Sequence, residues 1–401
     1  MIMGKGCTSL RVTFDLITRL RVASASKVHF ATQPPPPLSG PARMLLVCSC
    51  LVLAVVTVAA ARPIRPVYDV SRLPVFFHSS NSSGPFNAAA ITEMAKFPMV
   101  TVEKFQGTCW QRKDPTGCNQ TDIIVQQLAR VKALKPSVAT IVYFNSAIDF
   151  PQYRVHQKLL ANPSWRLRTS DGTVVKIKGD HIDGAWSFDY LNSAMAGALV
   201  EECARVVQMG LADGCFQDRA IDGLPRLPNA THATLWQVAH LKTLATMQDQ
   251  VRPGFVIGNH GYDERGTDAV MVESCANNDD GLKWLNESIS AGKIVQCHVS
   301  LRIGCGCAPG CKDRDSTLAM FLALMPPTGS ASTAYFGCGP WLDDGSDLSA
   351  NGWQEDYDFP LGEPLSAAAM SGDGILRRSF ASGTQVEYNT VSHEGQVTWA
   401  K

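Results

Sequence analysis

The run Asp213-Gly214-Cys215-Phe216-Gln217-Asp218-Arg219 follows a long helix-like segment and ends a short apolar stretch with a carboxylate beside a guanidinium. A second run, Ala269-Val270-Met271-Val272-Glu273-Ser274, ends in the same way with a glutamate. Short apolar runs bounded by polar residues are typical of buried strands. In a parallel barrel the carboxyl ends of the strands meet at one face, so we expect the two acids to lie close together there.

The chain after residue 61 repeats this alternation of short apolar runs and amphipathic segments. The alternation is typical of successive βα units rather than of a sandwich. Helix-like segments occupy residues 121–134, 191–209, 231–251, 278–291 and 313–325. The expected strands occupy residues 73–78, 99–104, 139–145, 213–218, 255–260, 269–274, 294–299 and 334–339. Eight strands in this order predict an α/β fold, a (β/α)8 TIM barrel.

Two regions exceed a minimal barrel. Residues 150–190 form a long loop insertion after the third strand, and such a loop lies at the face where barrel sites are built. Residues 380–389 indicate a hairpin after a Gly/Asp/Ser-rich stretch. We therefore expect the barrel over residues 62–340 and a short C-terminal β extension, residues 341–401, packed on it.

The N-terminal part has the composition of a targeting sequence. Residues 1–43 are basic and proline-rich, which predicts a disordered segment, and residues 44–61 are apolar except for Ser49 and Thr57. The finish Ala59-Ala60-Ala61 is typical of a signal-peptidase site, and an uncleaved signal anchor is the alternative. Either one predicts a secreted or luminal protein, held to a membrane only if the anchor persists.

Cysteines and glycosylation sequons agree with that compartment. Ten of the 13 cysteines lie beyond residue 61. Asn-x-Ser/Thr sequons occur on expected loops or helix surfaces, at Asn81, Asn119, Asn229 and Asn286. Disulfides and N-glycans both belong to the secretory route. We therefore expect a disulfide-bonded glycoprotein.

The cysteine-rich loop has two interpretations. Cys305, Cys307 and Cys311 crowd a Gly-rich stretch, whereas Cys109 and Cys118 bracket a polar loop. A zinc site is the first interpretation, but the crowded stretch contains no Cys-x-x-Cys pair. Disulfides are favoured, and the candidate partners of the crowded stretch are Cys275, Cys297 and Cys338. The sequence does not determine which cysteines pair.

Composition excludes several classes of partner. Hydrophobic residues make up 45% of the chain and charged residues 18%, and Lys+Arg equals Asp+Glu at 36 each. No overall field attracts nucleic acid or an anionic membrane. The chain has neither a Walker-type nor a dinucleotide fingerprint, so no cofactor is expected. The expected ligand is small or neutral.

The expected strand ends carry an unusual number of polar side chains, with Arg219 as almost the only basic one. They are His78, Glu103, Tyr143, Asn145, Asp218, Asn259, His260, Glu273, Gln296 and His298. Such a ring suits a polyhydroxylated neutral ligand, which indicates a carbohydrate. The predicted substrate-binding residues are Tyr143, Asn145, Asp189, Arg219, Asn259, His260 and His298.

Two acids in this ring suit glycosidic hydrolysis, which needs one carboxylate at the anomeric carbon and one acid to protonate the leaving oxygen. We expect Arg219 to keep Asp218 ionised as the nucleophile. The apolar neighbours of Glu273 predict a raised pKa and the acid/base role. The structural alternatives are an Asp218–Arg219 salt bridge and a buried Glu273 bonded to the backbone or a histidine.

Other polar residues are weaker candidates. Asp213 begins its strand, which favours turn chemistry. Glu103 could instead form a plain surface pair with Lys104, and Asp189 is expected first to cap a helix and second to touch ligand. Sugar stacking and simple packing are equally open for the loop tryptophans Trp165, Trp186 and Trp341.

These residues resemble a known family. Tyr143-Phe144-Asn145, Phe188-Asp189, the run 213–219 and the strand-six glutamate are similar to barrels of the "hypothetical glycosyl hydrolase 15" type. The tail resembles theirs in residues 357–364 and in Arg378-x-Phe380-x-x-Gly383-x-x-x-x-Tyr388-Asn389. The resemblance covers residues 73–389; the extra cysteines and the 305–311 loop depart from it.

The resemblance implies a TIM-barrel retaining glycosidase, with the strand-four Asp218 and strand-six Glu273 in roles like those of the α-galactosidase-type clan. Two other hypotheses remain beside it. One is a catalytically silent, lectin-like barrel that binds glycans. The other is a metal-dependent hydrolase using His298, His260 and Asp218, although no His-x-x-x-His spacing supports it and no metal site is expected.

Overall fold

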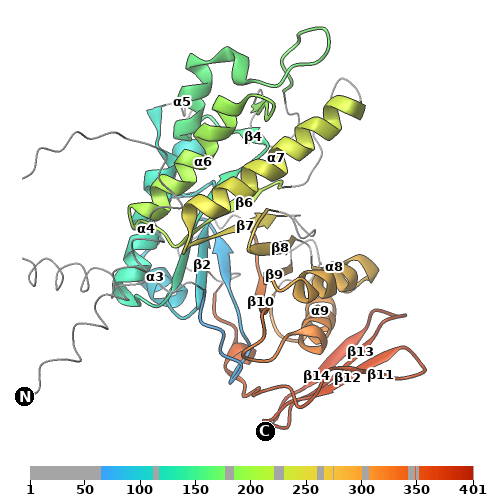
Figure 1. Ribbon diagram of the computed structural model, residues 1–401. Helices are drawn as coiled ribbons and strands as arrows, with labels where there is room; N and C mark the ends of the chain where they lie inside the picture. Colours follow the sequence, from blue (N-terminus) through green and yellow to red (C-terminus); the bar gives the residue numbers. More distant parts are fainter. Residues whose placement is uncertain are drawn as a thin grey trace, which may run out of the picture. The chain divides into compact units, whose positions relative to one another are not determined.

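The computed structural model describes residues 65–111, 117–176, 185–220, 230–259, 266–273, 275–299, 307–341, 348 and 352–400. An eight-stranded parallel sheet forms the centre of this part of the chain (Figure 1). Its strands, in spatial order, are β1 (Phe77–Ser79), β2 (Met99–Val102), β3 (Ala139–Asn145), β6 (Gly214–Asp218), β7 (Phe255–Asn259), β8 (Ala269–Glu273), β9 (Ile294–Val299) and β10 (Thr333–Cys338).

The sheet returns on itself. Val75 pairs with Phe336 of β10 in parallel, and the Phe76 amide donates to the Phe336 carbonyl at 3.0 Å. Every residue of β3 and of β9 is buried, as expected for strands covered on both faces. The predicted TIM barrel is confirmed.

Helices surround the sheet (Figure 1). They are α3 (Ala88–Met94), α4 (Gln120–Leu134), α5 (Arg154–Ala161), α6 (Ser193–Gln208), α7 (Ala230–Val251), α8 (Asp279–Ser290) and α9 (Lys312–Leu324). Asparagine side chains accept backbone N–H bonds at several helix starts, namely Asn119 at α4, Asn192 at α6 and Asn278 at α8. These caps satisfy amides that have no partner within the helix.

The insertion after β3 is ordered by aromatic packing. It contains β4 (Ile148–Asp149), α5, the 3-10 helix η3 (Pro163–Trp165) and β5 (Trp186–Ser187), and β4 pairs antiparallel with β5. The Arg166 guanidinium lies 3.4 Å from the Trp186 ring centroid, and His156 stacks on the same ring at 5.4 Å. Trp186 therefore packs within the insertion.

The C-terminal prediction was incomplete. Instead of a hairpin over residues 380–389, the chain forms a four-stranded antiparallel sheet beside α9 (Figure 1). Its strands are β11 (Ala369–Met370), β12 (Ile375–Ser379), β13 (Gln385–Asn389) and β14 (Gly395–Thr398). Residues 380–384 make the turn between β12 and β13, where Gly383 has a φ of 100° that favours glycine.

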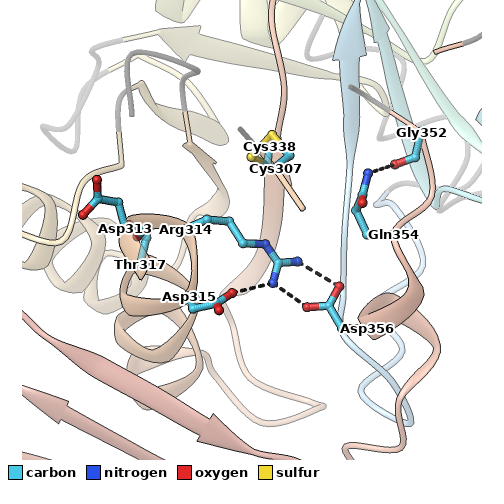
Figure 2. Close-up of a disulfide and its surroundings, with 9 residues drawn as sticks. All are labelled: Cys307, Asp313, Arg314, Asp315, Thr317, Cys338, Gly352, Gln354 and Asp356. Carbon is cyan, nitrogen blue, oxygen red and sulfur yellow. Dashed lines mark hydrogen bonds and ion pairs between the residues drawn. A yellow bond between two sulfur atoms is a disulfide. The ribbon is translucent and has the colours of Figure 1, made fainter. Parts of the chain in front are cut away.

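Disulfides join Cys109 to Cys118, Cys203 to Cys215, Cys275 to Cys297 and Cys307 to Cys338. Figure 2 shows the last of these at the end of β10. Cys311 is also disulfide-bonded, and Cys305 lies outside the described residues. The prediction of disulfides is therefore confirmed. Disulfide sulfurs are not the thiolates that a zinc site requires.

The predicted sequons differ in exposure. Asn81 was expected on an exposed loop. It is buried instead, and its side-chain amide donates to the Pro85 carbonyl. Asn119 is half-buried and caps α4, Asn286 is exposed on α8, and Asn229 lies outside the described residues. The expected N-terminal segments, residues 1–43 and 44–61, lie outside them as well. Among the helices described, none is long and apolar enough to cross a membrane.

Candidate active site

Asp218 accepts hydrogen bonds on both oxygens of its carboxylate. It ends β6 with its side chain 16% exposed. One carboxylate oxygen, Oδ2, accepts from the Tyr143 hydroxyl at 2.5 Å and from Asn145 Nδ2 at 3.1 Å. The other, Oδ1, accepts from Asn259 Nδ2 at 2.8 Å and from the Arg219 amide at 2.9 Å. Both oxygens are therefore engaged, which fixes the orientation of the carboxylate.

A single amide links the two predicted acids. Asn259 Nδ2 donates to Asp218 Oδ1 at 2.8 Å and to Glu273 Oε2 at 2.5 Å. Both N–H groups of the amide are thereby used. The two carboxylate oxygens are therefore no more than 5.3 Å apart, the two bond lengths taken together.

The sheet order explains why these residues meet. β3, β6, β7 and β8 are successive neighbours, and Asn145 of β3 lies opposite Asp218 in register. Asn259 and Glu273 each end their own strand. Arg219 has a φ of 56°, in the left-handed region, and this turn directs its amide toward the Asp218 carboxylate.

Lys104 is a cation that the sequence prediction missed at this site. Its Nζ lies 2.8 Å from Glu103 Oε2 and 4.0 Å from Asp218 Oδ2. It also lies 4.5 Å from the ring centroid of Tyr143. Burial lowers the pKa of Lys104, but the negative charges of Glu103 and Asp218 outweigh burial and raise it. Lys104 therefore remains positively charged.

Glu103 is not part of a surface pair, because only 2% of the residue is exposed. Its Oε1 lies 3.1 Å from His78 Nε2, while Oε2 faces Lys104. Burial raises the pKa of Glu103, but Lys104 and His78 lower it further than burial raises it. Glu103 and Lys104 lie just beyond β2, which ends at Val102. The sequence offered little sign of their buried contact, because an acid beside a lysine is also typical of a surface pair.

His298 lies beside Glu273 but has a different environment from the acids. It is opposite Glu273 in register, is buried, and stacks on Trp341 with 3.7 Å between ring centroids. Burial, assisted by His78, lowers the pKa of His298 to about 3, so the ring is neutral. Within the described residues neither ring nitrogen has a hydrogen-bond partner.

Two further candidates lie apart from this cluster, and a third lies outside the described residues. Asp189 accepts from the Leu191 amide at 3.1 Å, burial raises its pKa, and no described contact joins it to the acids. The cap of α6 is Asn192 instead. Asp213 is buried and accepts from the Thr140 amide at 2.8 Å, so it ties β6 to β3. His260 lies outside the described residues.

The described residues give no support to the metal-dependent hydrolase. No group of three His, Cys, Asp or Glu side chains there is arranged to hold a metal ion.

Residues 132–384 match the family model described as hypothetical glycosyl hydrolase family 15. The chain belongs to this family. The matched range includes both acids of this glycosyl hydrolase and the three residues that bond Asp218 through their side chains, Tyr143, Asn145 and Asn259. Lys104 and Glu103 precede it.

Solved structures of glycoside hydrolases are similar to this family member at low identity. The glycoside hydrolase domain of PelA from Pseudomonas aeruginosa is 15% identical with a TM-score of 0.40, over 65% of this chain and 95% of that one. The maltogenic α-amylase AmyB from Thermotoga neapolitana is 11% identical with a TM-score of 0.46, over 80% and 86%.

The α-galactosidase TtGalA from Thermus thermophilus is 16% identical with a TM-score of 0.34. That match spans 48% of this chain and only 39% of the α-galactosidase. No curated protein matches the chain.

Proposed function

We propose that this glycosyl hydrolase cleaves a neutral oligo- or polysaccharide with retention of anomeric configuration. The observation that carries the proposal is the Asn259 bridge, which keeps carboxylate oxygens of Asp218 and Glu273 within 5.3 Å. Retaining glycosidases hold their carboxyl groups about 5 to 5.5 Å apart, whereas inverting ones need about 6.5 Å or more to admit a water molecule.

Asp218 is the nucleophile in this proposal. Its four hydrogen-bond donors and the nearby Lys104 support an ionised, oriented carboxylate. An Asp218 oxygen forms a bond to the anomeric carbon while the glycosidic C–O bond breaks. Glu273 gives its proton to the leaving oxygen, then takes a proton from the water that releases the sugar from Asp218.

The charge of the site supports a neutral substrate. Glu103 and Asp218 both lie beside Lys104, so two carboxylates face this one cation and a uronate or sulfate on the sugar would meet negative charge. Tyr143, Asn145 and Asn259 orient Asp218, and Asn259 Oδ1, which has no hydrogen-bond partner within the described residues, is an acceptor of the kind that binds sugar hydroxyls.

We propose secretion for the same protein, through the apolar segment at residues 44–61. The disulfides support it, because such bonds form and persist in oxidising compartments. The barrel over residues 62–340 would then be released with the C-terminal extension, residues 341–401, attached.

The experiment compares Asp218→Asn and Glu273→Gln with matched substitutions of exposed acids. Asp249→Asn and Glu201→Gln are suitable controls, since their side chains are 77% and 70% exposed. Protein made through a secretory pathway is incubated with aryl glycosides and oligosaccharides, and released reducing ends are measured. The site variants should lose about a thousandfold or more in kcat, while the controls keep theirs.

Hydrolysis that survives in both site variants would contradict the assignment of the acids. Glycan binding without any released reducing ends, in the wild-type protein, would favour the lectin-like alternative instead.

A further inference from the structure

Trp341 follows β10 on a backbone that is fixed at several points. The Gly339 amide donates to the Val299 carbonyl at the end of β9, at 3.3 Å. Ser79 Oγ donates to the Pro340 carbonyl at 3.0 Å, and Ser80 Oγ donates to the Trp341 carbonyl at 3.1 Å. The Cys307–Cys338 disulfide holds the strand end just before it (Figure 2). Trp341 is thus held by the first, seventh and eighth barrel strands.

The indole lies among the side chains of the candidate active site. His298, opposite Glu273 in register, stacks on it with an interplanar angle of 19°. His78, which is bonded to Glu103, meets it edge-on with 4.8 Å between ring centroids. Trp341 nevertheless keeps part of its surface accessible.

Two other tryptophans show what a purely structural role looks like in this protein. Trp236 is 1% exposed, and its Nε1 donates to the Phe188 carbonyl at 2.9 Å. Trp186 has the Arg166 guanidinium 3.4 Å from its ring centroid. Trp341 differs from both in its described ring contacts, which are two histidines beside the acids.

We propose that Trp341 is the stacking platform for the sugar ring bound next to Asp218 and Glu273. The location of that ring rests on the proposed function. A pyranose has one face of C–H groups, and an indole offers a wide apolar surface with a negative π-face against which such a face packs. The neutral His298, which stacks on one face of the indole, adds no charge. The substrate class is an uncharged hexopyranoside with one unobstructed C–H face.

The test separates binding from hydrolysis by using the full chain with Glu273→Gln. The protein has eight tryptophans, so 5-fluorotryptophan labelling gives eight ¹⁹F signals, and Trp341→Phe assigns one of them. The probes are p-nitrophenyl glucosides, galactosides and mannosides of both anomers. We expect a saturable shift of the Trp341 signal. Adding Trp341→Ala should weaken binding about tenfold, whereas Trp399→Ala, in the C-terminal part, should not.

Each outcome bears on the platform separately from the chemistry. Saturable binding with an unmoved Trp341 signal, or with equal affinity in Trp341→Ala, would overturn the platform and leave hydrolysis standing. A shifted Trp341 signal in a protein whose wild type hydrolyses no probe would support the platform and count against the hydrolase. If no probe binds to any variant, the proposal that Trp341 stacks on hexopyranosides is wrong. The proposed function would then be tested separately, by whether the wild type hydrolyses other glycans.

Discussion

At the residue scale, Lys104 links a buried carboxylate to the proposed nucleophile. It lies between Glu103 and Asp218, and only 16% of its side chain is exposed. Replacing it by Met would leave Glu103 buried without its cation. Breaking a buried ion pair from one side is strongly destabilising, because the remaining charge stays desolvated. The lysine therefore contributes to stability as well as to the charge around Asp218.

We predict that Lys104→Met lowers the free energy of unfolding at pH 7 by roughly 2–3 kcal/mol. The pKa of Glu103 is lowered in the folded state, so its contribution is present above its usual pKa and is lost as the pH falls through the lower, folded value. The difference from wild type should therefore shrink as the pH falls below the usual glutamate pKa of 4.5. Urea unfolding across this range measures it.

Lys312→Met is the matched control, because Lys312 pairs with Glu394 on the exposed surface, where ion pairs contribute little. A difference between wild type and Lys104→Met that does not depend on pH would contradict the role of the Glu103 charge.

At the scale of elements, disulfides are attached to both strands that carry the proposed acids. Cys215 of β6 bonds to Cys203 of α6, and Cys275, just after β8, bonds to Cys297 of β9. The Cys275–Cys297 bond is attached to the chain two residues after Glu273. It fixes the chain immediately after the acid and beside His298.

We predict that Cys275→Ala combined with Cys297→Ala lowers both stability and kcat. The bond closes a loop of 22 residues, and its loss should cost about 3 kcal/mol. The kcat should fall because Glu273 loses its fixed position. The control combines Cys109→Ala with Cys118→Ala, a loop of 9 residues ahead of α4, and should leave kcat unchanged. Equal kcat values in the two double variants would contradict a positioning role for the bond near Glu273.

The sequence allowed most strands to be predicted, because barrel strands are buried on both faces and appear as apolar runs. β3 and β9 have the predicted limits, and β6 and β8 end at or one residue before the predicted ends. The first strand was predicted at residues 73–78 but β1 covers only Phe77–Ser79. β11, β12 and β14 were missed; the side chains of β11 and β14 are exposed or half-exposed and carry no apolar alternation.

The site was less predictable than the strands. Asp218 and Glu273 were found as strand ends, but the Asn259 bridge depends on side-chain directions that no spacing reveals. Arg219 was expected to supply the charge beside Asp218; its backbone amide donates to Asp218 Oδ1, and the role of its guanidinium stays a prediction. Lys104 lies 4.0 Å from Asp218 Oδ2 but was not predicted at the site. Its neighbour Glu103 made it resemble one half of an ordinary surface ion pair.

At the scale of the whole molecule, the C-terminal residues are joined to the barrel by a buried ion pair. Arg314 of α9 is 1% exposed and donates to both carboxylate oxygens of Asp356, at 2.5 and 2.8 Å, as Figure 2 shows. Asp356 lies in the 3-10 helix η4 (Glu355–Asp358). Arg378 of β12 also donates to the Met325 carbonyl at the end of α9. Residues 61–401 form one compact unit.

We predict that Asp356→Asn lowers the free energy of unfolding by about 3 kcal/mol, because the buried charge of Arg314 loses its bidentate partner. Unfolding should remain a single transition, followed by circular dichroism in urea. Glu387→Gln removes the exposed Arg377 pair and is expected to change little. Separate transitions for the barrel and the C-terminal sheet would contradict this coupling.

The most direct test of the central claim is to identify the residue that becomes covalently bound to sugar. The full-length protein is treated with 2-deoxy-2-fluoro glycosyl fluorides, which slow the release of a glycosyl-enzyme, and its peptides are analysed by mass spectrometry. The proposed retaining mechanism predicts an added sugar on Asp218 that is absent from the Asp218→Asn variant. Hydrolysis of the parent glycoside with no adduct, or an adduct on Glu103 or Glu273, would contradict it.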